Sequence, residues 1–164
     1  MTDQTLLRAV RHNIWANLKL LSFCSRLSAD QLAWKVPGTF GSIHETLQHV
    51  VRAESFYLRV LTGEQPPQGR IGSDLLPLED LTERERTNGE RIEHVLASAF
   101  DPGRVVTPGQ GETVTAGMLV AQFIHHGSDH RAHVGTILGA HGIELPEMDV
   151  WAYGASIGEV TRPA

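Results

Sequence analysis

The pattern of hydrophobic residues along the chain predicts four long amphipathic helices. In each of four segments, apolar residues recur every three or four positions, which places them on one face of a helix. In the first segment this apolar stripe consists of Leu7, Val10, Ile14, Leu18 and Leu21. The four predicted helices cover residues 3–27, 43–61, 78–100 and 116–141.

Residues that start and stop secondary structure separate these segments. Ser42 with Glu45 three positions later has the spacing of a capping box, which predicts the start of the second helix. Gly63 follows the predicted end of that helix. Residues 104–107 and 112–115 are rich in β-branched side chains and flank a glycine-containing turn, which predicts a short hairpin before the last helix.

Four such helices with little strand signal predict an all-α fold, a four-helix bundle. The connection over residues 63–77 is long enough to cross the bundle, so the order of helix directions stays open. The charged stretch at residues 83–94 is interpreted as a solvated helix face. The tail after the last helix is predicted to be irregular and to pack through Trp151 and Tyr153. We expect one domain over residues 1–164.

Composition and charge exclude several classes of function. The net charge is −5 and no block of Lys or Arg is present, so we expect no nucleic-acid or anionic-membrane partner. The single cysteine, Cys24, rules out an internal disulfide and is expected to be a buried, inert thiol. No signal-peptide pattern or membrane-length apolar run is visible, which predicts a cytoplasmic protein. Nine histidines beside 14 Lys plus Arg is an unusual ratio.

Two histidines of the last predicted helix suggest a metal site. His126 and His130 lie about 40° apart on the helical wheel, on the apolar face that carries Leu119, Phe123 and Ile137. A buried polar group without a partner costs a few kcal/mol, so imidazoles on this face require an explanation. Histidines four residues apart on a helix can bind one metal ion together. Core histidines that only hydrogen-bond the backbone can show the same spacing.

A third ligand would have to come from elsewhere. His49 on the second predicted helix is the leading candidate, because it shares an apolar flank with Phe56. The alternative is that His49 only hydrogen-bonds a backbone carbonyl, and periodicity favours neither interpretation. His133 is the main rival, as a third ligand or as a neighbour of a ligand, since it lies about 20° from His126 on the wheel.

Asp129 is a further candidate for the chemistry of this site. It directly precedes His130 and could orient a ligand imidazole or act as a base. The alternative is a solvated carboxylate that pairs with Arg131 or Arg52. The remaining histidines are expected outside the site, at the surface or near helix ends: His12, His44, His94, His125 and His141. No pair of Glu-x-x-His motifs is present, which argues against a di-iron carboxylate bundle.

Three segments, in their order along the chain, resemble the DinB/YfiT-like family of metal-dependent enzymes. RHNIWANLKLL at residues 11–21 is similar to the family's start, an aromatic residue followed by Asn-x-Trp-Ala-Asn-x-x-Leu. His49 followed five positions later by Glu54 resembles the family's second helix. HHGSDHRAHVGTIL at residues 125–138 is similar to its His-x3-His-Arg-Gly-Gln sequence. The resemblance covers nearly the whole chain and includes the short hairpin.

The resemblance implies a four-helix bundle with one divalent metal ion, usually zinc or nickel, bound by His49, His126 and His130. It also implies a homodimer. Ala132 and His133 stand where the family usually has Gly-Gln, so His133 could add a ligand or change the polarity of the substrate site.

Three neutral nitrogens with an open fourth position are typical of a catalytic metal ion. The family includes enzymes that resemble thiol-dependent S-transferases and isomerases. We therefore expect the metal ion to bind and deprotonate a low-molecular-weight thiol, which attacks an electrophilic small molecule, with Asp129 or His133 as the nearest proton handlers. The alternatives are hydrolysis by metal-bound hydroxide and a non-catalytic, stress-related dimeric bundle. Substrate specificity is expected to lie in residues 63–77 and near Trp151.

Overall fold

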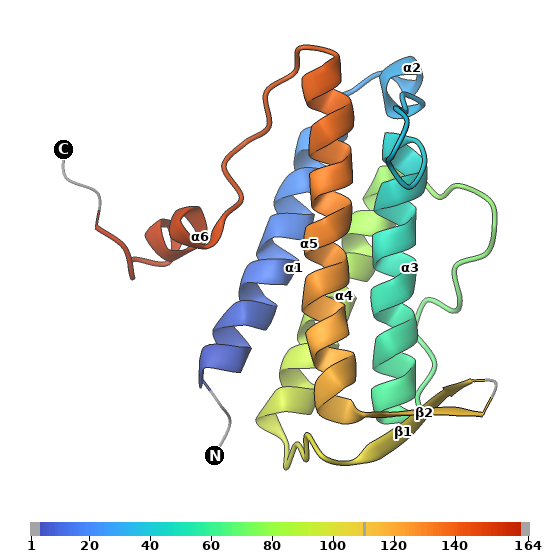
Figure 1. Ribbon diagram of the computed structural model, residues 1–164, viewed down its shortest axis with the longest axis vertical. Coiled ribbons are helices and arrows are strands. Elements are labelled where there is room, and N and C mark those ends of the chain that lie inside the picture. The colour runs from blue at the N-terminus through green and yellow to red at the C-terminus, as the bar shows by residue number, and fades with distance from the viewer. Residues whose placement is uncertain (1–3, 110, 162–164) are drawn as a thin grey trace.

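The structure is a computed structural model that describes residues 4–109 and 111–161, and four long helices dominate it (Figure 1). These helices are α1 (Gln4–Cys24), α3 (Ile43–Thr62), α4 (Leu78–Ala97) and α5 (Ala116–Ala140). Two short helices are α2 (Ala29–Leu32) and α6 (Val150–Ser156), and one hairpin joins β1 (Val105–Gly109) to β2 (Glu112–Thr115). All four predicted helices and the hairpin are confirmed, with ends within about one helical turn of the prediction.

The helices do not alternate in direction. Figure 1 shows α1 and α5 running one way and α3 and α4 running the other, with the connection after α3 returning along the length of the bundle. The predicted all-α bundle with a long crossover connection and a hairpin before the last helix is confirmed. Both α1 and α3 pack against α4 and α5. No helix in the described part of the chain has the length and apolar character that a membrane span requires.

Local signals set where the helices begin and end. Ser42 accepts a hydrogen bond from the Glu45 amide while the Glu45 side chain accepts one from the Ser42 amide, so the predicted capping box starts α3. Gly63 ends α3 with a φ of 78°, a left-handed conformation that glycine adopts without strain. At the start of α5, the Thr115 hydroxyl accepts a hydrogen bond from the Met118 amide.

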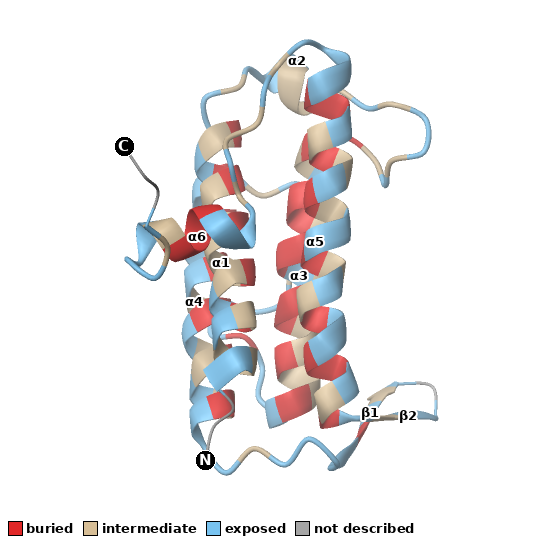
Figure 2. Cartoon of the chain, turned by 60° about the vertical axis from the view of Figure 1, so that its left-hand side comes forward, coloured by how far each residue is buried: buried red, intermediate tan, exposed pale blue. Residues whose placement is uncertain are grey.

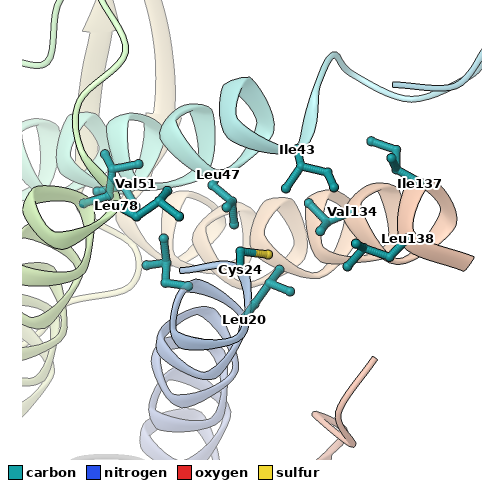
Figure 3. Close-up of a cluster of buried hydrophobic side chains, with 11 residues drawn as sticks. Leu20, Cys24, Ile43, Leu47, Val51, Leu78, Val134, Ile137 and Leu138 are labelled. Atoms are coloured by element: carbon teal, nitrogen blue, oxygen red, sulfur yellow. The ribbon is translucent and has the colours of Figure 1, made fainter. Parts of the chain in front are cut away.

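The core consists of two apolar clusters at different heights of the bundle, and buried residues lie on the facing sides of the helices (Figure 2). The first cluster includes Leu20, Cys24, Leu47 and Val134 (Figure 3). Cys24 is buried, as predicted, and burial raises the pKa of its thiol to about 12, which disfavours the reactive thiolate. The second cluster surrounds Phe123.

The tail differs from the prediction. Residues 150–156 form the short helix α6, which the Asp149 carboxylate caps by accepting a hydrogen bond from the Ala152 amide. Tyr153 is buried and packs against Trp15 of α1, with 5.5 Å between ring centroids, so packing through Tyr153 is confirmed. The expectation that Trp151 packs as well is wrong, because this side chain is 69% exposed. The helix α6 was not predicted because so short a helix shows no clear apolar period in the sequence.

Candidate metal centre

The structure brings together the three histidines that were predicted to share a metal ion. His49 of α3 faces His126 and His130 of α5, and one nitrogen from each ring lies within 4.8 Å of the others. His49 Nε2 lies 2.9 Å from His126 Nε2. These three residues are called the histidine cluster below. The four-residue spacing on α5 and the packing of α3 against α5 together produce it.

Two aromatic side chains enclose the histidine cluster. The Phe40 ring stacks on His49 with 4.0 Å between centroids and meets His130 edge-on at 5.1 Å. Tyr57 of α3 meets His126 edge-on at 5.8 Å. Sequence reasoning identified neither aromatic residue. Tyr57 lies eight positions, or about two helical turns, after His49 and could have been assigned to the same face from its spacing, whereas Phe40 lies in a loop.

The surroundings keep the three imidazoles neutral. Burial, followed by the positive charges that His130 and Arg52 would carry, lowers the pKa of His49 to about 4. Burial and the other two histidines likewise lower the pKa of His126 to about 4. The pKa of His130 is lowered by burial and by His133. At neutral pH each ring therefore keeps a free lone pair, which is the form that binds a metal ion.

The chain does not satisfy the hydrogen-bonding capacity of these rings by itself. The Nδ1 atoms of His49, His126 and His130 are all buried, and none has a hydrogen-bond partner in the described part of the chain. A buried polar atom left without a partner costs about 1–3 kcal/mol. The three neutral imidazoles converge closely enough to hold one metal ion together.

The other histidines behave differently. His12 Nε2 lies 2.9 Å from the Met148 carbonyl, and both His44 Nε2 and His141 Nδ1 lie 2.8 Å from a carbonyl oxygen. Their rings are thus held by the backbone. His94 and His125 are exposed as predicted, whereas His44 is partly buried rather than outside. The missing backbone partners set the histidine cluster apart from these core and surface histidines.

The two residues predicted to handle protons lie at different depths. The His133 ring meets His130 edge-on at 5.1 Å, and its Nδ1 atom is buried without a partner among the described residues. His133 lies beside the histidine cluster, and its nitrogens are not among those that converge. Asp129 is exposed, and its carboxylate lies 3.4 Å from His125 Nδ1. Asp129 therefore pairs with His125 rather than with Arg131 or Arg52.

A second polar group, fully inside the bundle, was not identified from the sequence. Arg131 Nη1 donates hydrogen bonds to Asn13 Oδ1 at 2.7 Å and to Asn17 Oδ1 at 2.6 Å. Asn13 Nδ2 donates to Glu54 Oε1 at 2.8 Å. Asn17 Nδ2 donates to Oε1 of both Glu54 and Glu85, at 2.8 Å each. These five residues from all four long helices form what is called the buried polar layer, and it separates the two apolar clusters.

One proton makes the buried polar layer electrically neutral. Glu54 and Glu85 are both completely buried, and their Oε2 atoms receive no N–H donor. Burial and the neighbouring charge of Glu85 hold the pKa of Glu54 well above its usual range, and burial also raises the pKa of Glu85. A protonated Glu54 can donate to Glu85, whose remaining negative charge balances Arg131.

The interpretation of residues 83–94 as a solvated face is wrong at four positions. Glu85, Asn88, Gly89 and Ile92 are buried. A signal was present, because Leu81, Glu85, Asn88 and Ile92 follow one another at steps of four, three and four residues. Glu85 and Asn88 thus continue an apolar stripe, and the charge of the surrounding residues concealed it.

A cavity of about 450 Å³ opens beside His49 and His126. Phe56 and Tyr57 of α3 form part of its wall, and the crossover connection contributes Ile71. This volume lies in the range of small-molecule sites. The histidine cluster is therefore accessible from a space that can hold a substrate, and part of the segment 63–77 borders that space.

Comparison with known proteins places these observations in a family. The model of the DinB family matches residues 1–159. No curated protein matches the chain.

Proposed function

The chain belongs to the DinB family, and we propose that it is a metal-dependent enzyme that transfers a small thiol to an electrophilic substrate. His49, His126 and His130 would hold one divalent ion, zinc or nickel. The observation that carries the proposal is the convergence of three neutral imidazoles, one nitrogen of each within 4.8 Å of the others, at the edge of an open cavity. A structural metal site would be closed by a fourth protein ligand.

A divalent ion bound there would lower the pKa of a coordinated thiol, so that the sulfur is a nucleophile at neutral pH. The chain's own residues do the rest. The histidine cluster supplies three ligands, so that a position stays available for an exogenous group. Phe40 packs on the His49 ring and Tyr57 on the His126 ring, which covers part of each imidazole. In the transfer, the sulfur forms a bond to an electrophilic carbon, the thiol proton passes to a base, and the leaving group departs with its bonding electrons.

We propose His133 rather than Asp129 as the nearer acceptor for that proton. His133 adjoins His130 and has a buried Nδ1 atom without a partner among the described residues. Asp129 is engaged with His125 at the surface. Assembly as a homodimer stays a prediction.

The experiment is a thiol-consumption assay with the zinc- or nickel-loaded protein, a panel of cellular thiols and 1-chloro-2,4-dinitrobenzene, which releases chloride when a C–S bond forms. We expect metal-dependent consumption of at least one thiol, abolished in His126→Ala and retained in His125→Ala, which removes the exposed neighbouring imidazole. Equal consumption by the loaded and metal-free proteins for every thiol would contradict the transferase.

The same assay separates the alternatives. A hydrolase would use the same three histidines and a metal-bound hydroxide, and it would cleave activated ester substrates without consuming thiol. If the loaded protein turned over neither thiols nor esters, the non-catalytic dimeric bundle would be supported instead.

A further inference from the structure

Three arginines line the cavity beside the histidine cluster. Arg52 and Arg59 project from α3, and Arg70 comes from the crossover connection. No Asp or Glu is among the described residues that line this cavity. The chain as a whole carries a net charge of −5, so the cavity is positive in an otherwise acidic protein.

The charges of these arginines are not neutralised by the chain. Among the described residues, the arginines in ion pairs are Arg8, Arg11 and Arg86, none of which lines the cavity. Four other guanidinium groups donate hydrogen bonds to backbone or side-chain oxygens: Arg84, Arg91, Arg104 and Arg131. In the described structure, the guanidinium groups of Arg52, Arg59 and Arg70 form neither an ion pair nor a hydrogen bond.

One of the three is nevertheless held in place. The Arg59 guanidinium lies over the Phe56 ring, 5.1 Å from its centroid, and this cation–π contact leaves the edge of the guanidinium free. A guanidinium presents two parallel N–H donors that match the two oxygens of a carboxylate or phosphate. The cavity thus combines donors for an oxyanion with an apolar wall formed by Phe56 and Ile71.

We propose that this cavity binds the anionic group, a carboxylate or a phosphate, of the small molecule that reacts at the histidine cluster. The anion would lie against Arg52, Arg59 and Arg70, while the reacting atom reaches His49 and His126 in the same cavity. The reaction at the histidine cluster rests on the proposed function, whereas the anion site does not. A cavity of about 450 Å³ fits a small metabolite rather than a polyanion, which the overall negative charge would repel.

The test of the anion site uses the metal-free protein and three probes: succinate, inorganic phosphate and neutral succinamide. Calorimetric titration should show binding of succinate or phosphate and much weaker binding of succinamide. Whichever anion binds more tightly identifies the preferred source of negative charge. Added salt should weaken the binding, because Arg52 and Arg70 are exposed and Arg59 is partly exposed.

Matched arginine variants locate the site. Arg59→Gln should weaken binding of the anion about tenfold, as expected for loss of one charge-assisted contact. Arg26→Gln is the control, because Arg26 lies over Phe23 at 5.0 Å in the same way but borders no part of the cavity. Equal affinity for succinate and succinamide, or equal loss of affinity in the two variants, would overturn the proposal.

A second titration separates failure of the anion site from failure of the thiol chemistry. The Co²⁺-loaded protein is titrated with 2-mercaptosuccinate and with uncharged 1-thioglycerol, and the visible absorption of the cobalt is recorded. We expect both thiols to change the spectrum, with 2-mercaptosuccinate binding more tightly in the wild type and losing affinity in Arg59→Gln. If both thiols bound equally in wild type and variant, the anion site would be refuted. If succinate bound the metal-free protein but neither thiol changed the spectrum, the anion site would stand and the thiol proposal would fail.

Discussion

The histidine cluster and the buried polar layer both contain residues of α3 and α5, yet one proton on Glu54 completes the layer, whereas the cluster stays incomplete. In the buried polar layer, Arg131 donates to the side-chain oxygens of Asn13 and Asn17, and the two amide nitrogens donate to Oε1 of the glutamates. In the histidine cluster, three Nδ1 atoms have no partner among the described residues and an open cavity adjoins the rings. A polar group completed by the chain holds helices together, whereas an incomplete one beside a cavity is prepared for a ligand.

The difference extends to charge. The layer contains fixed charges that cancel when Glu54 carries a proton. The cluster contains rings that burial keeps uncharged. Helix α5 contributes to both regions. His130 belongs to the histidine cluster, and the next residue, Arg131, belongs to the buried polar layer. Removal of a residue from the layer should therefore affect stability, and removal of a residue from the cluster should affect ligand binding.

The largest expected effect is that of Arg131→Met. Loss of the guanidinium leaves the charge of Glu85 buried and uncompensated, which should lower the free energy of unfolding by about 3–5 kcal/mol. His126→Ala in the metal-free protein should change that free energy by less than about 1 kcal/mol, because the deleted ring has an unsatisfied buried nitrogen. Urea denaturation of metal-free protein measures both. Arg26→Met, at the surface, is the control and should stay within about 0.5 kcal/mol of wild type. An equal loss in Arg131→Met and His126→Ala would remove the distinction between the two regions.

The next effect comes from Gly127, which allows α5 to approach α1 at the layer. A Cβ atom at this position would lie 2.3 Å from Asn13 Oδ1, so Gly127→Ala should displace that amide and lower the free energy of unfolding by about 1–3 kcal/mol. Gly139 lies in the same helix with nothing within 4 Å of the added atom. Gly139→Ala should instead stabilise the protein by about 0.5–1 kcal/mol through helix propensity. Thermal unfolding monitored by circular dichroism gives the sign of each change, and destabilisation of equal size in both variants would contradict the close approach.

The two regions should also impose opposite pH dependences on stability. The pKa of His49 and His126 is about 4 in the folded protein, below the usual 6.5, so between these values the unfolded chain binds more protons. The free energy of unfolding of the metal-free protein should therefore fall as the pH drops through that window. The pKa of Glu54 is raised above its usual 4.5, so above that pH the folded chain binds more protons and stability should fall as the pH rises.

Two variants distinguish the contribution of each region to the pH dependence of the free energy of unfolding. His126→Ala should flatten the dependence between about pH 4 and pH 6.5, and Glu54→Gln should flatten the fall above about pH 4.5, since glutamine resembles the protonated carboxyl. Urea midpoints across a pH series measure both slopes. If the fall in stability above about pH 4.5 were the same in Glu54→Gln and in wild type, Glu54 would not hold the buried proton.

The sequence predicted the long helices well, because each repeats its apolar positions over several turns. The spacing of His126 and His130 indicated two members of the cluster. His49 was the leading candidate for the third, and the resemblance supported that choice where periodicity favoured neither interpretation. The layer was missed because polar residues in an apolar stripe, such as Glu85, were interpreted as solvated. Residues of loops and short segments, such as Phe40 and Arg70, take their places from tertiary packing, which no local pattern encodes.

The most direct test of the central claim is a titration of the metal-free protein with Co²⁺, followed by visible absorption, for wild type, His126→Ala and His133→Ala. We expect one ion per wild-type chain, an affinity at least about a hundredfold lower in His126→Ala, and nearly unchanged stoichiometry in His133→Ala, because the converging nitrogens belong to His49, His126 and His130. If His126→Ala bound one Co²⁺ ion with the affinity and spectrum of the wild type, these three histidines would not be the metal site.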